Sequence, residues 1–164
     1  MPSRSRRVVV VAHCILNANA KYLGGAEYPG ANLEVVEPYL REGVGIVQLP
    51  CPESGLLGMS RWAMTRNQLD TGAYRRHCAE ILRPTVDMLE EFARAGYTIE
   101  GIVGVKGSPS CGVTDTSEGY AGGRIEGVPA HEHVVGRGVM MDVLAELLTE
   151  RGLPLTMLEV ADPD

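Results

Sequence analysis

Four short apolar runs recur along the chain, and each predicts a buried β-strand. The first run, at residues 8–11, consists of valines only and therefore has no polar face, which is typical of a strand in a parallel sheet that is covered on both sides. The predicted strands cover residues 7–12, 44–49, 99–105 and 155–160.

Segments with helical periodicity separate these runs. A helix is predicted over residues 32–41, with Gly43 behind it, and another over residues 135–150, with Gly152 as its stop. The longest helical pattern covers residues 74–95, and Pro84 inside it predicts a kink or a break into two helices. The Gly-rich, polar segment 112–127 has no periodicity and predicts a surface loop or an irregular hairpin.

Alternation of strands and helices predicts the fold class. We expect an α/β protein with a Rossmann-like, open, mostly parallel sheet of about four or five strands and helices on both faces. With 164 residues and no linker or internal repeat, residues 1–164 are expected to form a single domain. Residues 1–6 are rich in arginine and are expected to be a disordered basic arm.

Charge and hydropathy narrow the expected partners and compartment. The net charge of -6 argues against a nucleic-acid backbone, which binds basic surfaces, and a small molecule is the expected partner. No apolar stretch reaches the roughly 20 residues of a membrane span. Residues 4–20 resemble a signal peptide in outline, but His13, Asn17 and Asn19 interrupt the apolar region, so a cytoplasmic protein is expected. The sequence leaves the oligomeric state open, with a homodimer as one alternative.

Three of the four cysteines follow predicted strands directly. Cys14, Cys51 and Cys111 come after the first, second and third strands, respectively. In an open parallel sheet, ligands bind in the crevice outside the carboxyl ends of the strands. Cytoplasmic thiols stay reduced and can bind metal. The sequence therefore predicts a site with three thiolates at this edge, although buried cysteines are also common as small hydrophobic residues. Cys78, in the middle of a helix, is expected to be a packed or half-exposed bystander rather than a ligand.

A set of three thiolates could hold zinc with one open position, or a [4Fe–4S] cluster with one iron free of protein ligands. Structural zinc sites usually draw on closely spaced Cys-x-x-Cys pairs, and the chain contains none. Ligands at three separate strand ends favour the cluster. An iron with an open position could act as a Lewis acid or take up a sulfur.

Several polar residues are expected at the same edge. Glu53 is a candidate for proton transfer, although it could also be an ordinary surface carboxylate. Ser108 and Ser110 could contact substrate or relay a proton, or only form hydrogen bonds within their loop. Lys106 could neutralise an anion, and His13 is a candidate for contact with the substrate. His131 and His133 lie two residues apart, a spacing that suits a strand rather than one face of a helix. This pair is predicted to belong to a substrate loop or to plain surface rather than to a second metal site.

The segments around the three cysteines resemble a known family. Ala-His-Cys-Ile-Leu-Asn at 12–17, Leu-Pro-Cys-Pro-Glu at 49–53 and Gly-Ser-Pro-Ser-Cys-Gly at 107–112 look like the three cysteine motifs of the DUF523 family, whose characterised members are thiouracil desulfurases. The resemblance covers residues 8–112. It implies an oxygen-sensitive [4Fe–4S] cluster on the three cysteines and removal of sulfur from a thiolated base, with water as the source of oxygen and hydrogen sulfide as the product. It also implies catalytic roles for Glu53 and Ser108.

The chain departs from this family after its first cysteine. Family members usually carry Cys-Leu-Leu-Gly and then a stretch like Arg-Tyr-Asp-Gly, whereas residues 14–17 read Cys-Ile-Leu-Asn and residues 20–25 read Ala-Lys-Tyr-Leu-Gly-Gly. The loop expected to contact substrate is therefore rewritten.

Three other functions remain open from the sequence alone. One is an iron–sulfur hydro-lyase, in which the open iron binds a substrate hydroxyl. Another is a module that stores or transfers a cluster or sulfur without catalysis. The third is a Rossmann-like binding domain with unrelated cysteines, although the Gly-x-Gly-x-x-Gly signature of dinucleotide binding does not follow the first strand.

Overall fold

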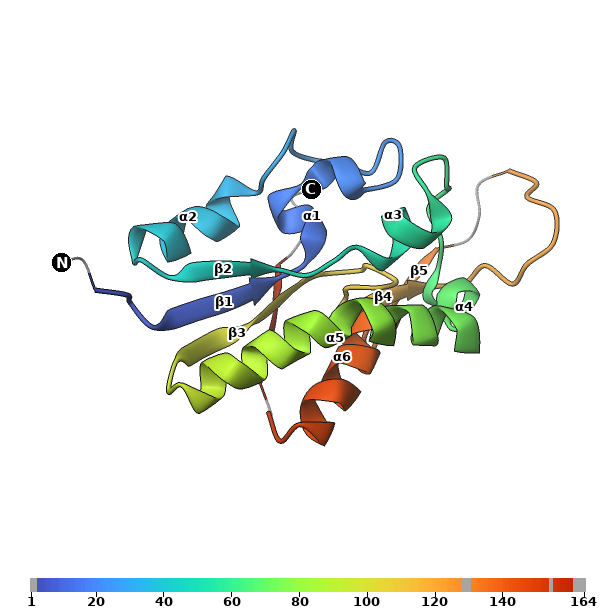
Figure 1. The fold of residues 1–164 in the computed structure, drawn as a ribbon. Coiled ribbons are helices and arrows are strands. Elements are labelled where there is room, and N and C mark those ends of the chain that lie inside the picture. Colours follow the sequence, from blue (N-terminus) through green and yellow to red (C-terminus); the bar gives the residue numbers. More distant parts are fainter. Residues whose placement is uncertain (1–2, 128–130, 154, 161–164) are drawn as a thin grey trace.

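A four-stranded parallel sheet forms the centre of the molecule (Figure 1). The structure is a computed structural model and describes residues 3–127, 131–153 and 155–160. The strand order is β2-β1-β3-β6, and every neighbouring pair is parallel. The strands match the four predicted runs to within two residues at each end: β1 Arg7–Val11, β2 Gly45–Gln48, β3 Thr98–Val105 and β6 Met157–Val160.

Helices cover both faces of this sheet, as the crossovers require. The chain moves from β1 to β2 in one direction and from β2 through β3 to β6 in the other, so right-handed crossovers put their helices on opposite faces. Helix α2 (Leu33–Arg41) lies on one side, while α5 (Gly72–Arg94) and α6 (Val139–Glu150) pack together on the other (Figure 1). The predicted α/β fold class is confirmed. The reversal of direction places a topological switch point at β1 and β3, where open sheets of this type bind ligands.

Helix α5 runs past Pro84 without interruption, so the predicted break into two helices is wrong. Pro84 has no N–H and leaves one carbonyl of the preceding turn without its helical partner. Its side chain is exposed, so that face of the helix meets water. The opposite face buries Leu82, Val86 and Leu89 in the core, and this packing outweighs one missing hydrogen bond.

A separate two-stranded antiparallel ribbon follows the main sheet. Strand β4 (Asp115–Glu118) lies within the segment predicted to be a loop or irregular hairpin, and its partner is β5 (Glu132–Val135). The helix predicted over residues 135–150 begins only at Val139, because Val135 is the last residue of β5 and Gly138 is the N-cap of the helix. Four short helical segments carry no periodicity that the sequence could have revealed: α1 His13–Leu16, the 3-10 turn η1 Ala18–Ala20, α3 Pro52–Leu57 and α4 Arg66–Leu69.

Most of the buried apolar side chains among the described residues form one cluster between the sheet and its helices. Val9, Val10 and Val11 of β1 are fully buried, as expected for a central strand with both faces covered. One domain over residues 1–164 stays a prediction. Within the predicted basic arm, Arg6 donates to the carbonyl of Ala95 and lies over the Tyr97 ring, whereas residues 1–2 fall outside the described part.

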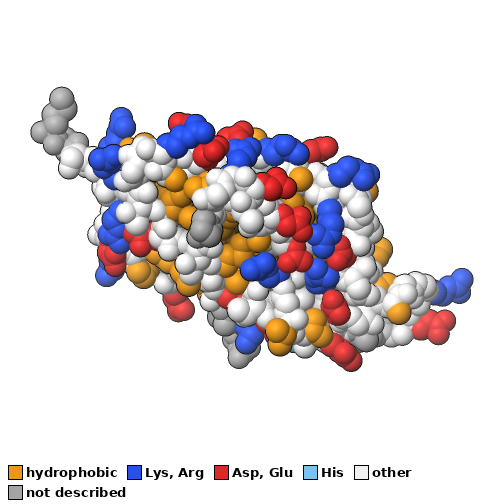
Figure 2. All heavy atoms as spheres, turned by 90° about the horizontal axis from the view of Figure 1, so that it is seen from below, with side chains coloured by type: hydrophobic (Ala, Val, Ile, Leu, Met, Phe, Trp, Pro, Cys, Tyr) orange, Lys and Arg blue, Asp and Glu red, His pale blue; other side chains and the backbone are white. Residues whose placement is uncertain are grey.

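The surface combines charged and apolar regions. On the face in Figure 2, hydrophobic side chains gather near the middle, with acidic and basic side chains around them. Among the described residues, no helix combines the length and the hydrophobicity that a bilayer span requires.

Candidate active site

The three predicted cysteines line one cavity. Cys14 follows β1, Cys51 follows β2 and Cys111 lies in the loop after β3, so the carboxyl ends of three adjacent strands bring them to the same place. The cavity has a volume of about 620 Å³, within the range of small-molecule sites. Polar and charged side chains make up much of the rest of its wall: His13, Lys21, Glu27, Glu53, Arg61, Lys106, Ser108, Ser117, His131 and His133.

Backbone contacts hold the first two cysteines. The hydroxyl of Tyr28 donates to the carbonyl of Cys14 at 2.9 Å and ties the loop that follows η1 to the start of α1. Cys51 is the N-cap of α3, and the backbone N–H of Ser54 donates to its sulfur at 3.4 Å. Pro52 begins this helix, where its missing N–H has no consequence.

The loop around Cys111 is built by hydrogen bonds and by one close approach. The side-chain oxygen of Ser108 accepts the N–H of Cys111 at 3.0 Å, and the carbonyl of Ser108 accepts the hydroxyl of Thr116 at 3.0 Å. The first turn of α6 supports the loop from behind, since Val139 N–H donates to the Pro109 carbonyl at 2.9 Å. A Cβ at Gly138 would lie only 2.3 Å from the carbonyl carbon of Ser110, so glycine allows the helix to approach.

The charges of the three thiols influence one another. Burial raises the pKa of Cys111 well above its usual value, and negative charge on Cys14 or Cys51 raises it further. Three thiolates in this cavity would therefore require positive charge, which a bound metal cluster would supply. In the described part of the chain, no three His, Cys, Asp or Glu side chains converge tightly enough for a single metal ion. Three cysteines on one cavity are a donor set that suits a [4Fe–4S] cluster with one open iron, and in this respect the residues present fit such a group.

Cys78 has the first of the two environments predicted for it, a packed one. Its side chain is fully buried in the core among apolar residues of α5, and it does not line the cavity. Burial raises the pKa of its thiol to about 12, so the thiol stays protonated and unsuited to bind metal.

A buried contact between a glutamate and an arginine forms part of the wall of the cavity. Glu53, on α3, lies with its Oε1 3.7 Å from the Nε of Arg61, and both side chains are largely buried. Burial raises the pKa of Glu53, and the opposing effect of Arg61 is smaller. The other Arg61 nitrogens donate to the carbonyls of Gly58 at 2.9 Å and Ala20 at 2.6 Å, while Nε has no hydrogen-bond partner among the described residues.

The two predicted serines have different surroundings. Ser108 lines the cavity while its hydroxyl also accepts loop N–H groups. Ser110 is fully buried, does not line the cavity, and shares a 2.7 Å hydrogen bond with the Tyr74 hydroxyl. Burial, followed by the charge of Glu53, raises the pKa of Tyr74, so this phenol stays neutral. Contact of Ser110 with a substrate stays a prediction.

The remaining predicted residues all reach the cavity wall. His13 is half-buried, with Nδ1 3.1 Å from the carbonyl oxygen of Leu49, and Lys106 is exposed. His131 and His133 also line the cavity, and His133 lies on β5, in agreement with the strand that their spacing indicates. The roles of these residues stay predictions.

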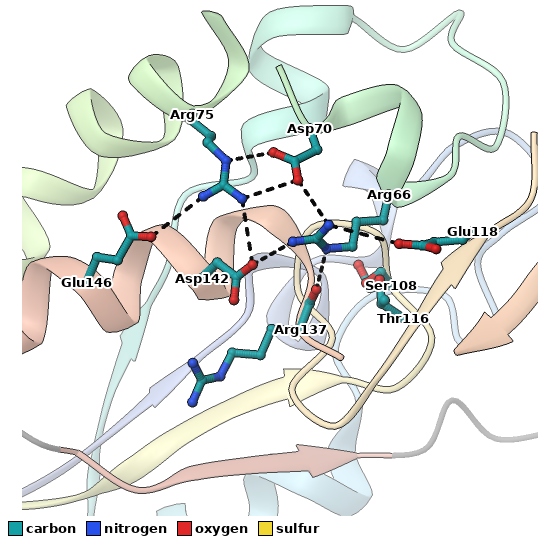
Figure 3. Close-up of polar contacts among 9 residues, drawn as sticks. All are labelled: Arg66, Asp70, Arg75, Ser108, Thr116, Glu118, Arg137, Asp142 and Glu146. Carbon is teal, nitrogen blue, oxygen red and sulfur yellow. Dashed lines mark hydrogen bonds and ion pairs between the residues drawn. The ribbon is translucent and has the colours of Figure 1, made fainter. Parts of the chain in front are cut away.

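An ion-pair network lies behind the Cys111 loop (Figure 3). Arg66 of α4 donates to Asp142 of α6 at 2.7 Å and to Asp70 at 3.0 Å, and its Nε donates to the carbonyl of Arg137 at 2.8 Å. Arg75 of α5 donates to Asp70 at 2.6 Å, and this hydrogen bond lowers the pKa of Asp70. The network holds α4, α5 and the start of α6 together, and the start of α6 supports Cys111.

Sequence reasoning missed Arg61 and Tyr74. Arg61 lies in a segment without periodicity, and Tyr74 occupies an apolar position of α5 that predicts only packing. The sequence also did not predict the contact between His133 and Asp115, in which Nδ1 of His133 lies 2.7 Å from Oδ1 of Asp115. It depends on the pairing of β4 with β5, which the sequence did not reveal.

Comparison with known proteins places the chain among relatives. No protein-family model matches it. Its fold resembles that of a [4Fe-4S]-dependent thiouracil desulfidase, TudS, described as a DUF523 protein, with a TM-score of 0.53 and 23% identity over 93% of this chain and 90% of the other. The chain is also 36% identical over 110 residues to the uncharacterized protein MJ0003 of Methanocaldococcus jannaschii. These 110 residues are 67% of this chain and 70% of that protein. The chain therefore belongs to the same family as MJ0003, and its fold is similar to that of a DUF523 protein.

Proposed function

We propose that this protein is a divergent DUF523 protein and a [4Fe–4S]-dependent desulfidase, which removes sulfur from a small thiolated compound such as 2-thiouracil and releases sulfide. The observation that carries the proposal is the convergence of Cys14, Cys51 and Cys111 on one cavity at the carboxyl edge of the sheet. The fold shared with a thiouracil desulfidase supports it.

Cys14, Cys51 and Cys111 would hold the cluster. With three protein ligands, a bound cluster would supply an iron with an open position, a Lewis acid suited to sulfur. Arg61, Lys21 and Lys106 in the same wall would offset the negative charge of the thiolates. Cys78 is not part of this set.

Glu53 would act as the proton donor. Its raised pKa favours the protonated carboxyl, which can deliver a proton to the departing sulfur. Arg61 would position Glu53, because its two hydrogen bonds to backbone carbonyls hold the guanidinium beside the carboxyl. Ser108, in the cavity wall, would orient the substrate, and Lys106 and His13 would bind its polar atoms.

The overall reaction would be a hydrolysis. A C=S group and water give a C=O group and hydrogen sulfide, so no electrons are exchanged with an outside donor or acceptor. The substrate would be a free small molecule rather than a nucleic acid or a membrane component, since the chain carries a net charge of -6. We place the activity in the cytoplasm, where thiols stay reduced.

Anaerobic purification followed by a sulfide-release assay with 2-thiouracil tests the proposal. Sulfide and uracil in equal amounts are expected from the wild type, and neither from Cys14→Ser, Cys51→Ser or Cys111→Ser. Cys78→Ala serves as the control, since it removes a thiol outside the cavity. Dehydration of a hydroxy acid without sulfide release would instead indicate a hydro-lyase. A cluster that transfers readily to an acceptor without any turnover would indicate a storage module.

A further inference from the structure

A histidine paired with a carboxylate lies at the mouth of the cavity, on the β4–β5 ribbon. The register places His133 opposite Ser117, and Asp115 two residues before Ser117. Residues two apart share a face of a strand, so Asp115 and His133 are diagonal neighbours on the same face. Their side chains meet, with Nδ1 of His133 2.7 Å from Oδ1 of Asp115.

This contact determines which ring nitrogen of His133 can accept a proton. In a neutral imidazole, a hydrogen bond to an ionised carboxylate, which only accepts, places the hydrogen on Nδ1 and leaves the lone pair on Nε2. In the described part of the chain, no hydrogen bond to Nε2 competes for it. The His133 side chain is 63% exposed, whereas that of Asp115 is 21% exposed. The imidazole of His133 is therefore exposed to solvent, whereas Asp115, the residue that orients it, is mostly buried.

Gly107 provides the surface against which the ring packs. A Cβ at this position would lie 2.5 Å from Cε1 of His133, so the ring contacts the glycine backbone directly. Gly107 immediately precedes Ser108 in the loop that leads to Cys111, and its N–H donates to the carbonyl of Asp115 at 3.1 Å. The ribbon and the cysteine loop are thus joined where the imidazole enters the cavity wall.

We propose that His133, oriented by Asp115, is the general base that activates the attacking water in the reaction of this site. The inference rests on the proposed desulfidase function and adds a residue to it. Glu53 and His133 line the same cavity, but Glu53 is largely buried beside Arg61, whereas His133 meets solvent, from which the water must come. A base at the mouth and an acid in the interior separate the two proton transfers.

The step balances in atoms and electrons. The oxygen of water forms a bond to the thiolated carbon while the π bond of C=S breaks and leaves its electron pair on sulfur, and one O–H bond breaks as its proton moves to Nε2 of His133. Glu53 gives a proton to the sulfur, the remaining C–S bond breaks with its electron pair on sulfur, and the second O–H proton is lost as the C=O bond forms. Of the two protons that water supplies, one completes hydrogen sulfide and the other returns to Glu53, and no redox partner is required.

Kinetics of the reconstituted holoenzyme with 2-thiouracil test the base. A positioned general base typically contributes about 10²–10⁴-fold, so His133→Ala is expected to lower kcat at least about 100-fold with little change in KM. Because the side chain is exposed, added imidazole can reach the vacated space and is expected to restore part of kcat. Glu132→Gln is the matched control: it alters a neighbouring exposed residue of β5 that does not line the cavity, and kcat is expected to stay unchanged.

A second readout needs neither cluster nor substrate. In the metal-free protein, ¹⁵N NMR of His133 is expected to show a hydrogen on Nδ1 and a lone pair on Nε2 in the neutral ring, and Asp115→Ala is expected to abolish this preference. Asp115→Ala should also lower kcat more than it raises KM, because Asp115 acts only through His133.

The outcomes separate the inference from the function on which it rests. Turnover by the wild type with equal kcat in His133→Ala would overturn the base role alone, as would a neutral ring with no tautomer preference. A loss that imidazole does not restore, with a matching rise in KM, would mean that His133 only binds substrate. A wild type that contains the cluster but releases no sulfide would remove the proposed function, and the base role with it.

Discussion

Gly138→Ala tests the support of the Cys111 loop with a single methyl group. The added Cβ would lie 2.3 Å from the carbonyl carbon of Ser110, 2.5 Å from its oxygen and 2.7 Å from the nitrogen of Cys111, where ordinary contacts are 3.4–4 Å. The backbone at Gly138 has φ -68° and ψ 160°, which alanine adopts freely. Any effect of the substitution therefore comes from the contact and not from backbone strain.

The size of the effect follows from the distances. Helix α6 and the loop must separate by about 1 Å to accept the methyl group. Overpacking of this kind costs about 1–3 kcal/mol, and weakening the hydrogen bonds of Val139 to Pro109 and Met141 to Ser110 adds to the cost. Alanine gains about 0.4–1 kcal/mol by restricting the unfolded chain. We expect a net loss of about 1–3 kcal/mol in the free energy of unfolding, or a fall of roughly 3–10 °C in Tm.

Thermal unfolding followed by circular dichroism, together with iron content after anaerobic reconstitution, measures the result. Gly30→Ala is the matched control, because a Cβ there meets nothing within 4 Å and the backbone angle is ordinary. We expect Gly138→Ala to lose both stability and iron, while Gly30→Ala loses neither. Equal Tm and full iron content in the two variants would refute the role of Gly138 in holding Cys111.

Three further substitutions test the charges around the site. Burial raises the pKa of Glu53, so the ionised form of this carboxyl costs stability as the pH rises above the usual carboxyl pKa. At pH 8, Glu53→Gln should therefore have a Tm no lower than that of the wild type, although it should lose sulfide release. A marked fall in Tm would contradict this. Arg61→Met removes charged hydrogen bonds to one buried and one part-buried carbonyl and should cost roughly 2–4 kcal/mol in a urea titration. A loss under about 1 kcal/mol would be the contrary result. Arg75 lowers the pKa of Asp70, so the stability that this carboxylate contributes is present above its usual pKa and is lost as the pH falls through the lowered pKa. Asp70→Asn should therefore be less stable than the wild type at pH 7, and the difference in stability should shrink below about pH 4. A difference that stays constant with pH would contradict this linkage.

The strands and the position of the cysteines could be predicted because each rests on a local signal. A valine run buried on both faces indicates a central parallel strand, and the residue after such a strand lies at the carboxyl edge of the sheet. Cys14, Cys51 and Cys111 therefore came together in the structure as their positions in the chain indicated. Glu53 and Ser108 reached the same cavity because each lies within three residues of one of these cysteines.

Features that depend on distant partners could not be predicted. Arg61 acquires its place from the carbonyl of Ala20, 41 residues earlier. The pairing of Asp115 with His133 needs the register of a short antiparallel ribbon whose strands are separated by a polar segment without periodicity. Pro84 shows the reverse error. A strong local rule predicted a kink or a break at this residue, but the helix is not broken, because burial of one face of α5 stabilises it.

Counting iron and acid-labile sulfide per chain after anaerobic purification tests the central claim most directly. The wild type is expected to hold about four of each, and Cys111→Ser is expected to fold while losing them. Iron-free wild-type protein after careful reconstitution would contradict the cluster site. Zinc in place of iron, or a full cluster retained in Cys111→Ser, would contradict it equally.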